Sequence, residues 1–297
     1  MGPERQKWLR SSARVAAQLF YTLRMRTMQA ILVVILLAGA SAAQTALNFP
    51  PLDQWKTAVL SGNAAQLAPF YSVTPPAQIK TVHGTLDGAA DAAFWANVKC
   101  KSMELTVVQA ATPQPGLQAV LFNADLKTAS RTVKVSDQQL WQLQNGVWVI
   151  VRSQRDVIKL EQPLTMDDHI YPAGNARDEI RAAEGRATPA HKRILVVFGA
   201  DWCYDCHVLD KAFQRKDIAA ILGRSYEVVH VDVGNSEKNQ DLMNEYGVPM
   251  KRGIPAIAIL DSAGKLLYSQ KNGEWERARA LGPEDLIALL NKWKPQA

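Results

Sequence analysis

The chain has 297 residues, of which 47% are hydrophobic, so it is long enough for about two domains with packed cores and too apolar for wholesale disorder. Its net charge of +6 suggests a nucleic-acid or membrane-surface partner. However, residues 1–42 carry six basic side chains and one acidic side chain. Subtracting these from the totals of 34 and 28 leaves 28 basic and 27 acidic residues in the rest of the chain. This near-neutral body excludes an electrostatic footprint for nucleic acid.

Residues 1–42 have the three parts of an export signal. Arg24 and Arg26 precede an apolar run over 30–38, and small residues with A-x-A patterns follow over 38–43. The apolar run is shorter than the about 20 residues that a membrane-spanning helix needs, so a cleaved signal peptide is favoured over a membrane anchor. We therefore predict a periplasmic or otherwise extracytoplasmic protein.

Helical patterns come first in the body of the chain. Apolar residues spaced for one helix face predict a helix over 52–71, in which Asn63 is placed to cap a second helical piece that ends before Pro69. A further short helix is predicted over 89–96. Strand-like segments then follow at 103–109, 118–123, 130–135, 138–144 and 147–152. The last two flank Asn145-Gly146, a pair that fits the positive φ angles of a tight hairpin turn.

Helices followed by antiparallel strands predict an α+β domain over 47–160. The helix segments Asp53-Gln54-Trp55-Lys56 and Gly62-Asn63, with Leu140-Trp141-Gln142-Leu143 and Trp148-Val149-Ile150 in the last hairpin, fit this order. The pattern resembles the nuclear-transport-factor-two-like or ketosteroid-isomerase-like cone fold, in which a curved sheet wraps the helices. The resemblance implies a module that binds a small ligand or forms dimers. The polar residues available for a pocket there are His83, Asp87, Asp91 and Asp125, but scattered polar residues are usually at the surface, so we assign them no catalytic role.

Residues 161–174 are rich in turn formers and acids, which predicts a linker before a second domain over 175–297. Asn175 is a suitable cap for the first helix of that domain. The helices are predicted over 175–184, 203–222, 236–246 and 283–293, and the strands over 193–199, 226–233, 254–260 and 265–270. The strand over 193–199 is an unbroken apolar run, which is typical of a strand buried on both faces.

The segment Trp202-Cys203-Tyr204-Asp205-Cys206 lies between a predicted strand and a predicted helix. A C-x-x-C pair alone is a weak signal, because zinc sites use the same spacing. In an exported chain, however, such a pair is more often a working dithiol than an inert structural staple, because its loop is too short to restrict the unfolded chain much. The third cysteine, Cys100, is interpreted as a small buried hydrophobic residue.

The stretch from Phe198 to His207 resembles the active-site turn of the thioredoxin family, and Gly253-Ile254-Pro255-Ala256 resembles the cis-proline loop of that family. With the predicted order α-β-α-β-α-β-β-α, the resemblance covers the whole of 175–297 and implies an α/β thioredoxin fold. It also implies that Pro255 follows a cis peptide bond and that backbone groups of Ile254 meet an extended substrate segment. Trp202 and Tyr204, beside the first cysteine, are further candidate substrate-binding or tuning residues.

The chemistry of disulfide exchange supports this interpretation independently. The reaction needs a thiolate that attacks an outside disulfide and a second thiol that releases the mixed disulfide. A helix that begins at Cys203 directs unpaired N–H groups at its sulfur and lowers the pKa of the thiol. Cys206, three residues later, lies on nearly the same face of the helix. We therefore predict that Cys203 is the exposed nucleophile and Cys206 the more buried resolving thiol.

Three neighbours are expected to tune the pair. A protonated His207 would stabilise the Cys203 thiolate, although an exposed helical histidine without a role is equally expected. Asp205 acts in the opposite sense, since a nearby carboxylate disfavours a thiolate. Val197 is a departure from similar thioredoxins, which carry at this strand position a buried Asp thought to shuttle the proton of the resolving thiol. That role is left empty, or falls to Asp205 or to water.

The predicted function is an extracytoplasmic thiol–disulfide oxidoreductase that acts on protein disulfides and thiols and needs no cofactor and no metal. A reducing role would require an electron donor in the membrane, because the compartment favours oxidised thiols. One alternative is that the N-terminal domain binds a ligand or partner and the second domain is an accessory redox or docking module. Another is copper handling by Cys203, Cys206 and His207, although a metal site needs three or four ligands. The sequence does not decide the oligomeric state, the substrate or the direction of electron flow.

Overall fold

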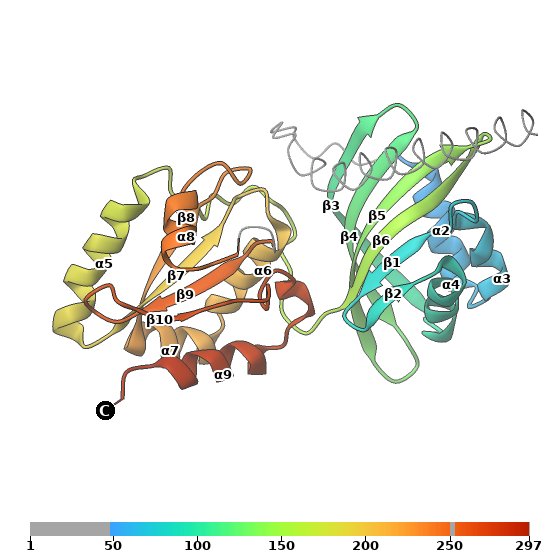
Figure 1. Ribbon diagram of the computed structural model, residues 1–297. Coiled ribbons are helices and arrows are strands. Elements are labelled where there is room, and N and C mark those ends of the chain that lie inside the picture. The colour runs from blue at the N-terminus through green and yellow to red at the C-terminus, as the bar shows by residue number, and fades with distance from the viewer. Residues whose placement is uncertain (1–47, 250–252, 297) are drawn as a thin grey trace, which may run out of the picture. The chain divides into compact units, whose positions relative to one another are not determined.

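The computed structural model describes residues 48–249 and 253–296, so the predicted leader over 1–42 lies outside the described residues. The described residues form one six-stranded sheet and one four-stranded sheet (Figure 1). The six-stranded sheet belongs to residues 48–157, here called the cone-like part, and the four-stranded sheet to residues 176–296, here called the C-terminal part. In the part of the chain that is described, no helix combines the length and the apolar character needed to cross a membrane.

The cone-like part begins with helices and ends in a long antiparallel meander. Its helices are α2 (Pro50–Leu60), α3 (Ala64–Leu67), η1 (Ala68–Phe70) and α4 (Gly88–Asn97). Its strands are β1 (Gln78–Thr81), β2 (Gly84–Leu86), β3 (Ser102–Gln114), β4 (Leu117–Lys127), β5 (Thr132–Gln144) and β6 (Val147–Val157). They lie in the order β2-β1-β6-β5-β4-β3, and all neighbours are antiparallel except β1 and β6.

Capping and turn residues determine where these elements end. The side chain of Asn63 accepts a hydrogen bond from the backbone N–H of Ala65 at 2.9 Å, which confirms the predicted cap of α3. Asn145 and Gly146 have φ values of 50° and 81°, and they turn β5 directly into β6, as the Asn-Gly pair predicts.

Two predictions for the cone-like part were wrong, and two short strands were missed. The helix predicted over 52–71 is interrupted, because α2 ends at Leu60 and Gly62 has a φ of 64°. The two strands predicted at 130–135 and 138–144 are one strand, β5, because the intervening Ser136 and Asp137 also pair with β4. Strands β1 and β2 were missed, because each is only three or four residues long and is defined by pairing with distant partners.

The core of the cone-like part lies between its sheet and its helices. Trp55, Trp95 and Phe122 are fully buried and in contact, with ring centroids 4.9 Å apart for Trp55–Trp95 and 5.6 Å apart for Trp55–Phe122. Figure 1 shows α2, α3 and α4 together on one side of the twisted sheet. This is the α+β cone-like arrangement that the sequence predicts.

Helices and strands alternate in the C-terminal part. Its helices are α5 (Ala176–Ala190), α6 (Tyr204–Phe213), α7 (Lys216–Ser225), α8 (Gln240–Glu245), η2 (Ala278–Ala280) and α9 (Pro283–Trp293). Its strands are β7 (Arg193–Gly199), β8 (Tyr226–Asp232), β9 (Ala256–Leu260) and β10 (Leu266–Ser269), in the sheet order β10-β9-β7-β8. Strand β7 is parallel to β8 and antiparallel to β9, which gives the mixed sheet of a thioredoxin fold.

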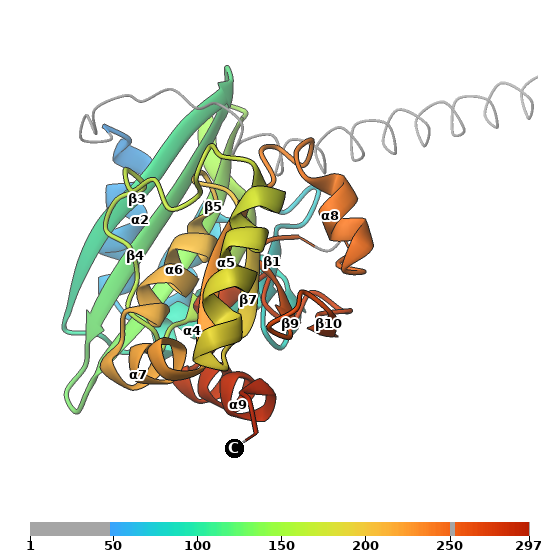
Figure 2. The ribbon, with the colours of Figure 1, turned by 90° about the vertical axis from the view of Figure 1, so that its left-hand side faces the viewer.

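Strand β7 is buried on both faces, as its unbroken apolar run predicts. Leu195 and Val197 pack with residues of α6, α7 and α9, whereas Ile194 and Val196 pack with residues of α5 and α8. Figure 2 shows α5 and α6 lying near β7 in this layered arrangement. The strand therefore ends at Gly199 inside the protein, and the turn that follows it starts from a rigid base.

Three helix predictions for the C-terminal part need correction. The helix predicted over 175–184 continues to Ala190. The helix predicted over 203–222 is two helices, because the backbone is extended at Arg215, where φ is −61° and ψ is 138°, and this residue is the N-cap of α7. The helix predicted over 236–246 begins only at Gln240, because Ser236 and Asn239 have φ values of 76° and 51°. Strand β7 and helix α9 match their predicted bounds.

Candidate active site

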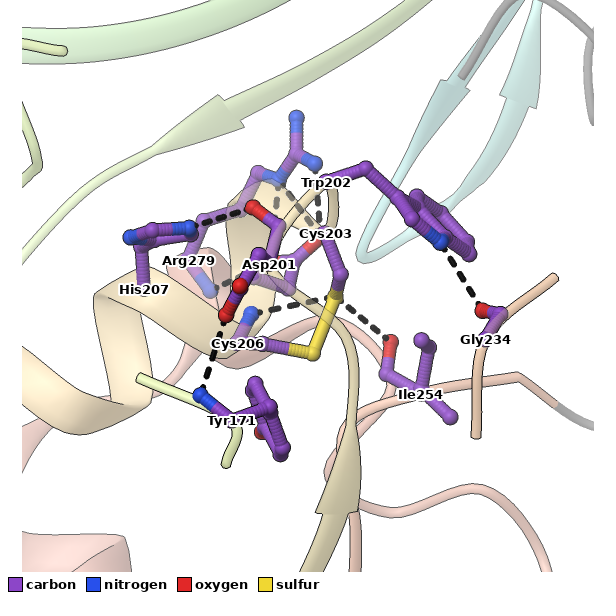
Figure 3. The surroundings of a disulfide bond; sticks show 10 residues. Tyr171, Asp201, Trp202, Cys203, Cys206, His207, Gly234, Ile254 and Arg279 are labelled. Atoms are coloured by element: carbon purple, nitrogen blue, oxygen red, sulfur yellow. Dashed lines mark hydrogen bonds and ion pairs between the residues drawn. A yellow bond between two sulfur atoms is a disulfide. The ribbon is translucent and has the colours of Figure 1, made fainter. Parts of the chain in front are cut away.

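Cys203 and Cys206 form a disulfide at the start of α6, with their Cα atoms 5.2 Å apart (Figure 3). Cys203 is the N-cap of the helix, and its sulfur accepts a hydrogen bond from the backbone N–H of Cys206 at 3.2 Å. The positive end of the helix dipole lies at the same atom. Both effects stabilise negative charge on the Cys203 sulfur after reduction.

The loop that contains Pro255 faces this sulfur. The Ile254–Pro255 peptide bond is cis, as the family resemblance implied. The carbonyl oxygen of Ile254 lies 3.7 Å from Cys203 Sγ, although the two residues are 51 positions apart in the chain. The fold therefore brings the nucleophile and the backbone of the cis-proline loop together, as Figure 3 shows for Ile254.

Both cysteines are buried, which differs from the prediction of an exposed Cys203. Their exposed fractions are 4% for Cys203 and 1% for Cys206. The cause is a cluster of apolar side chains around the disulfide, to which Ile170, Tyr171, Trp202 and Ile254 contribute. The predicted order, with Cys206 the more deeply buried of the two, is observed.

The residues just before α5 are fixed to the site by Asp201. Its Oδ1 accepts hydrogen bonds from the backbone N–H groups of Ile170 and Tyr171, both at 3.0 Å. Its Oδ2 lies 2.9 Å from Nδ1 of His169. From the sequence, this stretch is predicted only to be a linker. The signal that could have shown its role is the apolar pair Ile170-Tyr171 directly after the polar run over 167–169.

Asp205 belongs to a buried ion pair. Its carboxylate accepts hydrogen bonds from the backbone N–H of Arg279 at 2.9 Å, from its Nε at 3.0 Å and from its Nη2 at 2.6 Å. Both side chains are buried. Because the guanidinium compensates the carboxylate charge, we expect Asp205 to oppose the Cys203 thiolate less than its position in the turn predicts. Arg279 was missed, because nothing in its local sequence pairs it with a residue 74 positions away.

His207 is also buried and does not have the exposed position that was expected. Its Nε2 lies 2.6 Å from the backbone carbonyl oxygen of Asp201. Because a carbonyl only accepts hydrogen bonds, this ring nitrogen carries the proton. Figure 3 shows the ring directed at Asp201 and not at the sulfur atoms. The imidazole holds the turn between β7 and α6 in place.

The two aromatic residues beside Cys203 have different environments. Trp202 is partly exposed, and its Nε1 donates a hydrogen bond to the carbonyl oxygen of Gly234 at 2.9 Å. Tyr204 is buried, and its hydroxyl lies 2.6 Å from Asn123 Oδ1 and 2.7 Å from Gln162 Oε1. Burial raises the pKa of Tyr204 to about 12. Of the two, Trp202 is the one placed to meet a substrate.

Val197 occupies the strand position that carries an Asp in similar thioredoxins. Both this residue and the side chains that pack around it are apolar. Val197 is buried in the core that β7 shares with α6, α7 and α9. Its neighbour on β8 is His230, which lies 3.7 Å from Asp210. Burial lowers the pKa of His230, so its ring favours the neutral form.

The polar residues considered for a pocket in the cone-like part lie apart from one another. Asp87 caps α4, Asp125 pairs with Lys134 on the sheet, and His83 is exposed. Only Asp91 lies in the interior, where it accepts hydrogen bonds from three side chains. These are the Tyr71 hydroxyl at 2.8 Å, Trp95 Nε1 at 3.1 Å and Arg155 Nε at 2.7 Å.

A second buried carboxylate, Asp137, was missed by the sequence analysis. It accepts hydrogen bonds from the hydroxyl of Ser153 and from Nε2 of Gln139. Burial, together with the nearby charge of Asp91, raises the pKa of Asp137 to about 7.

Across 48–249 and 253–296, no group of three or more His, Cys, Asp or Glu side chains is arranged to hold a metal ion.

The site geometry agrees with a comparison against protein families. A family model described as thioredoxin-like matches residues 176–262, which include β7, the C-x-x-C turn and the cis-proline loop. The C-terminal part is a thioredoxin-like domain. A thioredoxin-like domain with a cysteine pair at the start of its helix is of the thiol–disulfide oxidoreductase kind, and protein thiols and disulfides are its general substrates.

Solved structures resemble each part of the chain. A disulphide isomerase from Xylella fastidiosa Temecula1 is 35% identical, with a TM-score of 0.41, and the match covers 42% of this chain and 97% of that chain. An NTF-2 like protein from Shewanella oneidensis MR-1 is 17% identical, with a TM-score of 0.32 and coverages of 36% and 93%. An NTF2-like protein from Rhodospirillum rubrum ATCC 11170 is 14% identical, with a TM-score of 0.32 and coverages of 36% and 95%. No curated protein matches the chain.

Proposed function

We propose that this chain exchanges disulfides with other proteins through Cys203 and Cys206 of its thioredoxin-like domain. The observation that carries the proposal is the position of the cysteine pair. The pair caps α6, and its first sulfur faces the carbonyl oxygen of Ile254 in the cis-proline loop. An inert structural disulfide would need neither the helix N-terminus nor the facing loop.

The exchange has two steps. In the reduced protein, the Cys203 thiolate attacks one sulfur of a substrate disulfide, forms a mixed disulfide and releases the other substrate sulfur as a thiolate. Cys206 then loses its proton and attacks Cys203 Sγ, which forms the Cys203–Cys206 bond and releases the second substrate sulfur. Two electrons pass from the protein to the substrate, together with the proton of Cys206, and the other substrate thiolate takes its proton from the solvent. The reverse sequence donates a disulfide.

The neighbouring residues prepare the first step. The backbone N–H of Cys206 donates to Cys203 Sγ and thus favours the thiolate over the thiol. The ion pair with Arg279 reduces the opposition of the Asp205 carboxylate to that effect. The carbonyl of Ile254 is available to pair with the backbone of an extended substrate. The partly exposed Trp202 packs, like Ile254, against the disulfide.

We further propose that the exchange takes place outside the cytoplasm. The basic residues, the apolar run and the A-x-A patterns of residues 1–42 support this location. A reducing direction would then need an electron donor in the membrane, whereas an oxidising direction agrees with the compartment. Amino-terminal sequencing of the mature protein should find a start near residues 41–44; a full-length mature chain in the cytoplasm would contradict this location.

The function is tested by disulfide reduction with cysteine variants. Cys203→Ser should abolish reduction of a protein disulfide, and Cys206→Ser should trap the mixed disulfide on Cys203, because the resolving thiol is missing. Cys100→Ser is the matched control and should retain the wild-type rate, since Cys100 is buried in the cone-like part. A wild-type rate in Cys203→Ser would refute the mechanism.

A further inference from the structure

Tyr171 lies against the disulfide from the segment that precedes α5 (Figure 3). Its exposed fraction is 6%, and its side chain packs with Cys203 and Cys206. The backbone N–H of Tyr171 is bonded to Asp201, and its ring meets the ring of His230 edge-on at a centroid distance of 5.3 Å. Both the backbone and the ring are therefore held in one position.

The hydroxyl group of Tyr171 is buried, yet it has no hydrogen-bond partner among the described residues. Buried hydroxyl groups are nearly always hydrogen-bonded, because an unpaired one loses its hydration without compensation. The contrast with Tyr204 and Tyr226 is direct, since both of these buried tyrosines have partners for their hydroxyl groups. An unpaired donor in a fixed position is available to an acceptor that forms beside it in another state of the protein.

The sulfur of Cys206 lies in the same buried cluster as Tyr171, and reduction turns this sulfur into a stronger acceptor. A Cβ atom added to Gly199 would lie 2.0 Å from the Tyr171 hydroxyl oxygen and 2.8 Å from Cys206 Sγ. The Tyr171 hydroxyl therefore occupies the place that a side chain at position 199 would fill, and Cys206 Sγ borders the same place. In the disulfide, Sγ of Cys206 is a poor acceptor. After reduction it becomes a thiol or thiolate, and a thiolate accepts hydrogen bonds strongly.

We propose that the Tyr171 hydroxyl donates a hydrogen bond to the Cys206 thiolate and so assists the resolving thiol at a site where the apolar Val197 offers no polar group. This inference rests on the proposed function and assigns a residue outside the matched span 176–262 to the site. In resolution, Cys206 must lose its proton before it attacks Cys203 Sγ. A donor beside Cys206 stabilises that thiolate, and the released substrate sulfur takes up the proton.

The surroundings of Tyr171 favour a donor and not a base. Burial raises the pKa of the Tyr171 hydroxyl well above its usual range, and the carboxylates of Asp210, Asp201 and Asp232 raise it further. The hydroxyl therefore keeps its proton at every pH at which thiols exchange. A further titratable neighbour is the ring of His230, which burial favours in its neutral form.

Tyr171→Phe removes the hydroxyl and keeps the ring, and the matched control is Tyr226→Phe. Tyr226 is also buried, but its hydroxyl donates to the carbonyl oxygen of Leu290, away from the dithiol. All variants of the full chain should carry Cys100→Ser, so that only the Cys203–Cys206 pair reacts. The probe is dithiobis-nitrobenzoate, an aromatic disulfide that releases one coloured thiol on attack by Cys203 and a second one on resolution by Cys206.

Stopped-flow kinetics separates the two releases, because attack depends on the probe concentration and resolution does not. We expect resolution at neutral pH to slow by about tenfold in Tyr171→Phe, and the midpoint of its pH profile to rise by about one unit, which corresponds to about 1.4 kcal/mol. Attack should change by less than about twofold, because its thiolate is held by the N–H of Cys206. Tyr226→Phe should match the parent in both phases.

A second measurement does not depend on turnover. In a Cys203→Ser background, Cys206 is the only remaining thiol, and its thiolate absorbance gives its pKa directly; Tyr171→Phe should raise that pKa. An unchanged resolution rate, or an unchanged pKa of Cys206, in Tyr171→Phe would overturn the inference. If the parent protein resolves the probe but reduces no protein disulfide, the proposed function fails while the role of Tyr171 stands.

Discussion

The effect of the Asp205 carboxylate on the cysteine pair depends on Arg279, a partner that is distant in the chain. The place of Asp205 between the two cysteines predicts a carboxylate that disfavours the nearby thiolate. In the structure, the same carboxylate is bound on its far side by Arg279 of η2. The position in the C-x-x-C turn could be predicted, but the pairing could not, because salt bridges between distant segments leave no periodic signal in the sequence.

Loss of Arg279 should therefore damage the protein strongly. Arg279→Met keeps the length of the side chain and leaves Asp205 buried without its cation, so the free energy of unfolding should fall by about 3–5 kcal/mol. Asp205→Asn in the same background should restore part of the loss, since it removes the uncompensated charge. Urea unfolding measures both. A change below about 1 kcal/mol in Arg279→Met would show that the pair is not buried as described.

At the scale of elements, predictable features were those with a local physical cause. The bounds of β7 could be predicted from its unbroken apolar run, and the start of α9 from Pro283 in its first turn. Asn63 and Asn175 cap α3 and α5 as predicted. The break between α6 and α7 and the late start of α8 were missed, because the backbone at these points is set by packing and by positive φ angles. Tyr171 was missed for a similar reason, because its contact with the disulfide depends on the fold and leaves no local pattern in the sequence.

The cap at Asn175 gives a test at this scale. Its side chain accepts hydrogen bonds from the N–H groups of Arg177 and Asp178, at 3.0 Å and 3.4 Å. Asn175→Ala should lower the free energy of unfolding by about 1 kcal/mol. Asn291→Ala, on the exposed side of α9, should change it by less than about 0.5 kcal/mol. Equal effects of the two substitutions would contradict the assignment of Asn175 as a cap.

The segment over 169–171 is a second element whose attachment can be measured. Asp201→Ala removes the acceptor for two backbone N–H groups and the contact with His169, so the segment should detach more often from the disulfide. After reduction, Cys203 should then react about threefold faster or more with a small aromatic disulfide. Asp167→Ala, an exposed residue of the same segment, should leave the rate unchanged. A slower reaction in Asp201→Ala than in Asp167→Ala would contradict this account of the burial of Cys203.

At the scale of the whole molecule, the buried charges of the cone-like part make stability depend on pH. Two carboxylates, Asp91 and Asp137, share the interior with the guanidinium of Arg155. The pKa of Asp137 is raised from 3.8 to about 7 by burial and by Asp91. A raised pKa in the folded state means that the folded protein binds the proton more tightly than the unfolded chain. The stabilising contribution is therefore complete below about pH 4 and is lost as the pH rises through about 7.

Asp137→Asn removes this titration and keeps a similar shape. The free energy of unfolding of the parent, relative to that of Asp137→Asn, should fall as the pH rises from about 4 to about 8. Chemical unfolding at a series of pH values measures the difference. A difference that stays constant, or that increases with pH, would show that Asp137 is charged in the folded protein.

The central claim is that the Cys203–Cys206 bond is made and broken in the working cycle of the protein. Its most direct test is the equilibrium of the full chain with glutathione buffers, followed by alkylation of the free thiols and mass measurement. We predict one two-electron transition with a potential between about −270 and −120 mV, the span from reducing to oxidising members of this kind of protein. A pair that stays oxidised in every glutathione buffer, with a potential below about −300 mV, would identify a structural disulfide and contradict the claim.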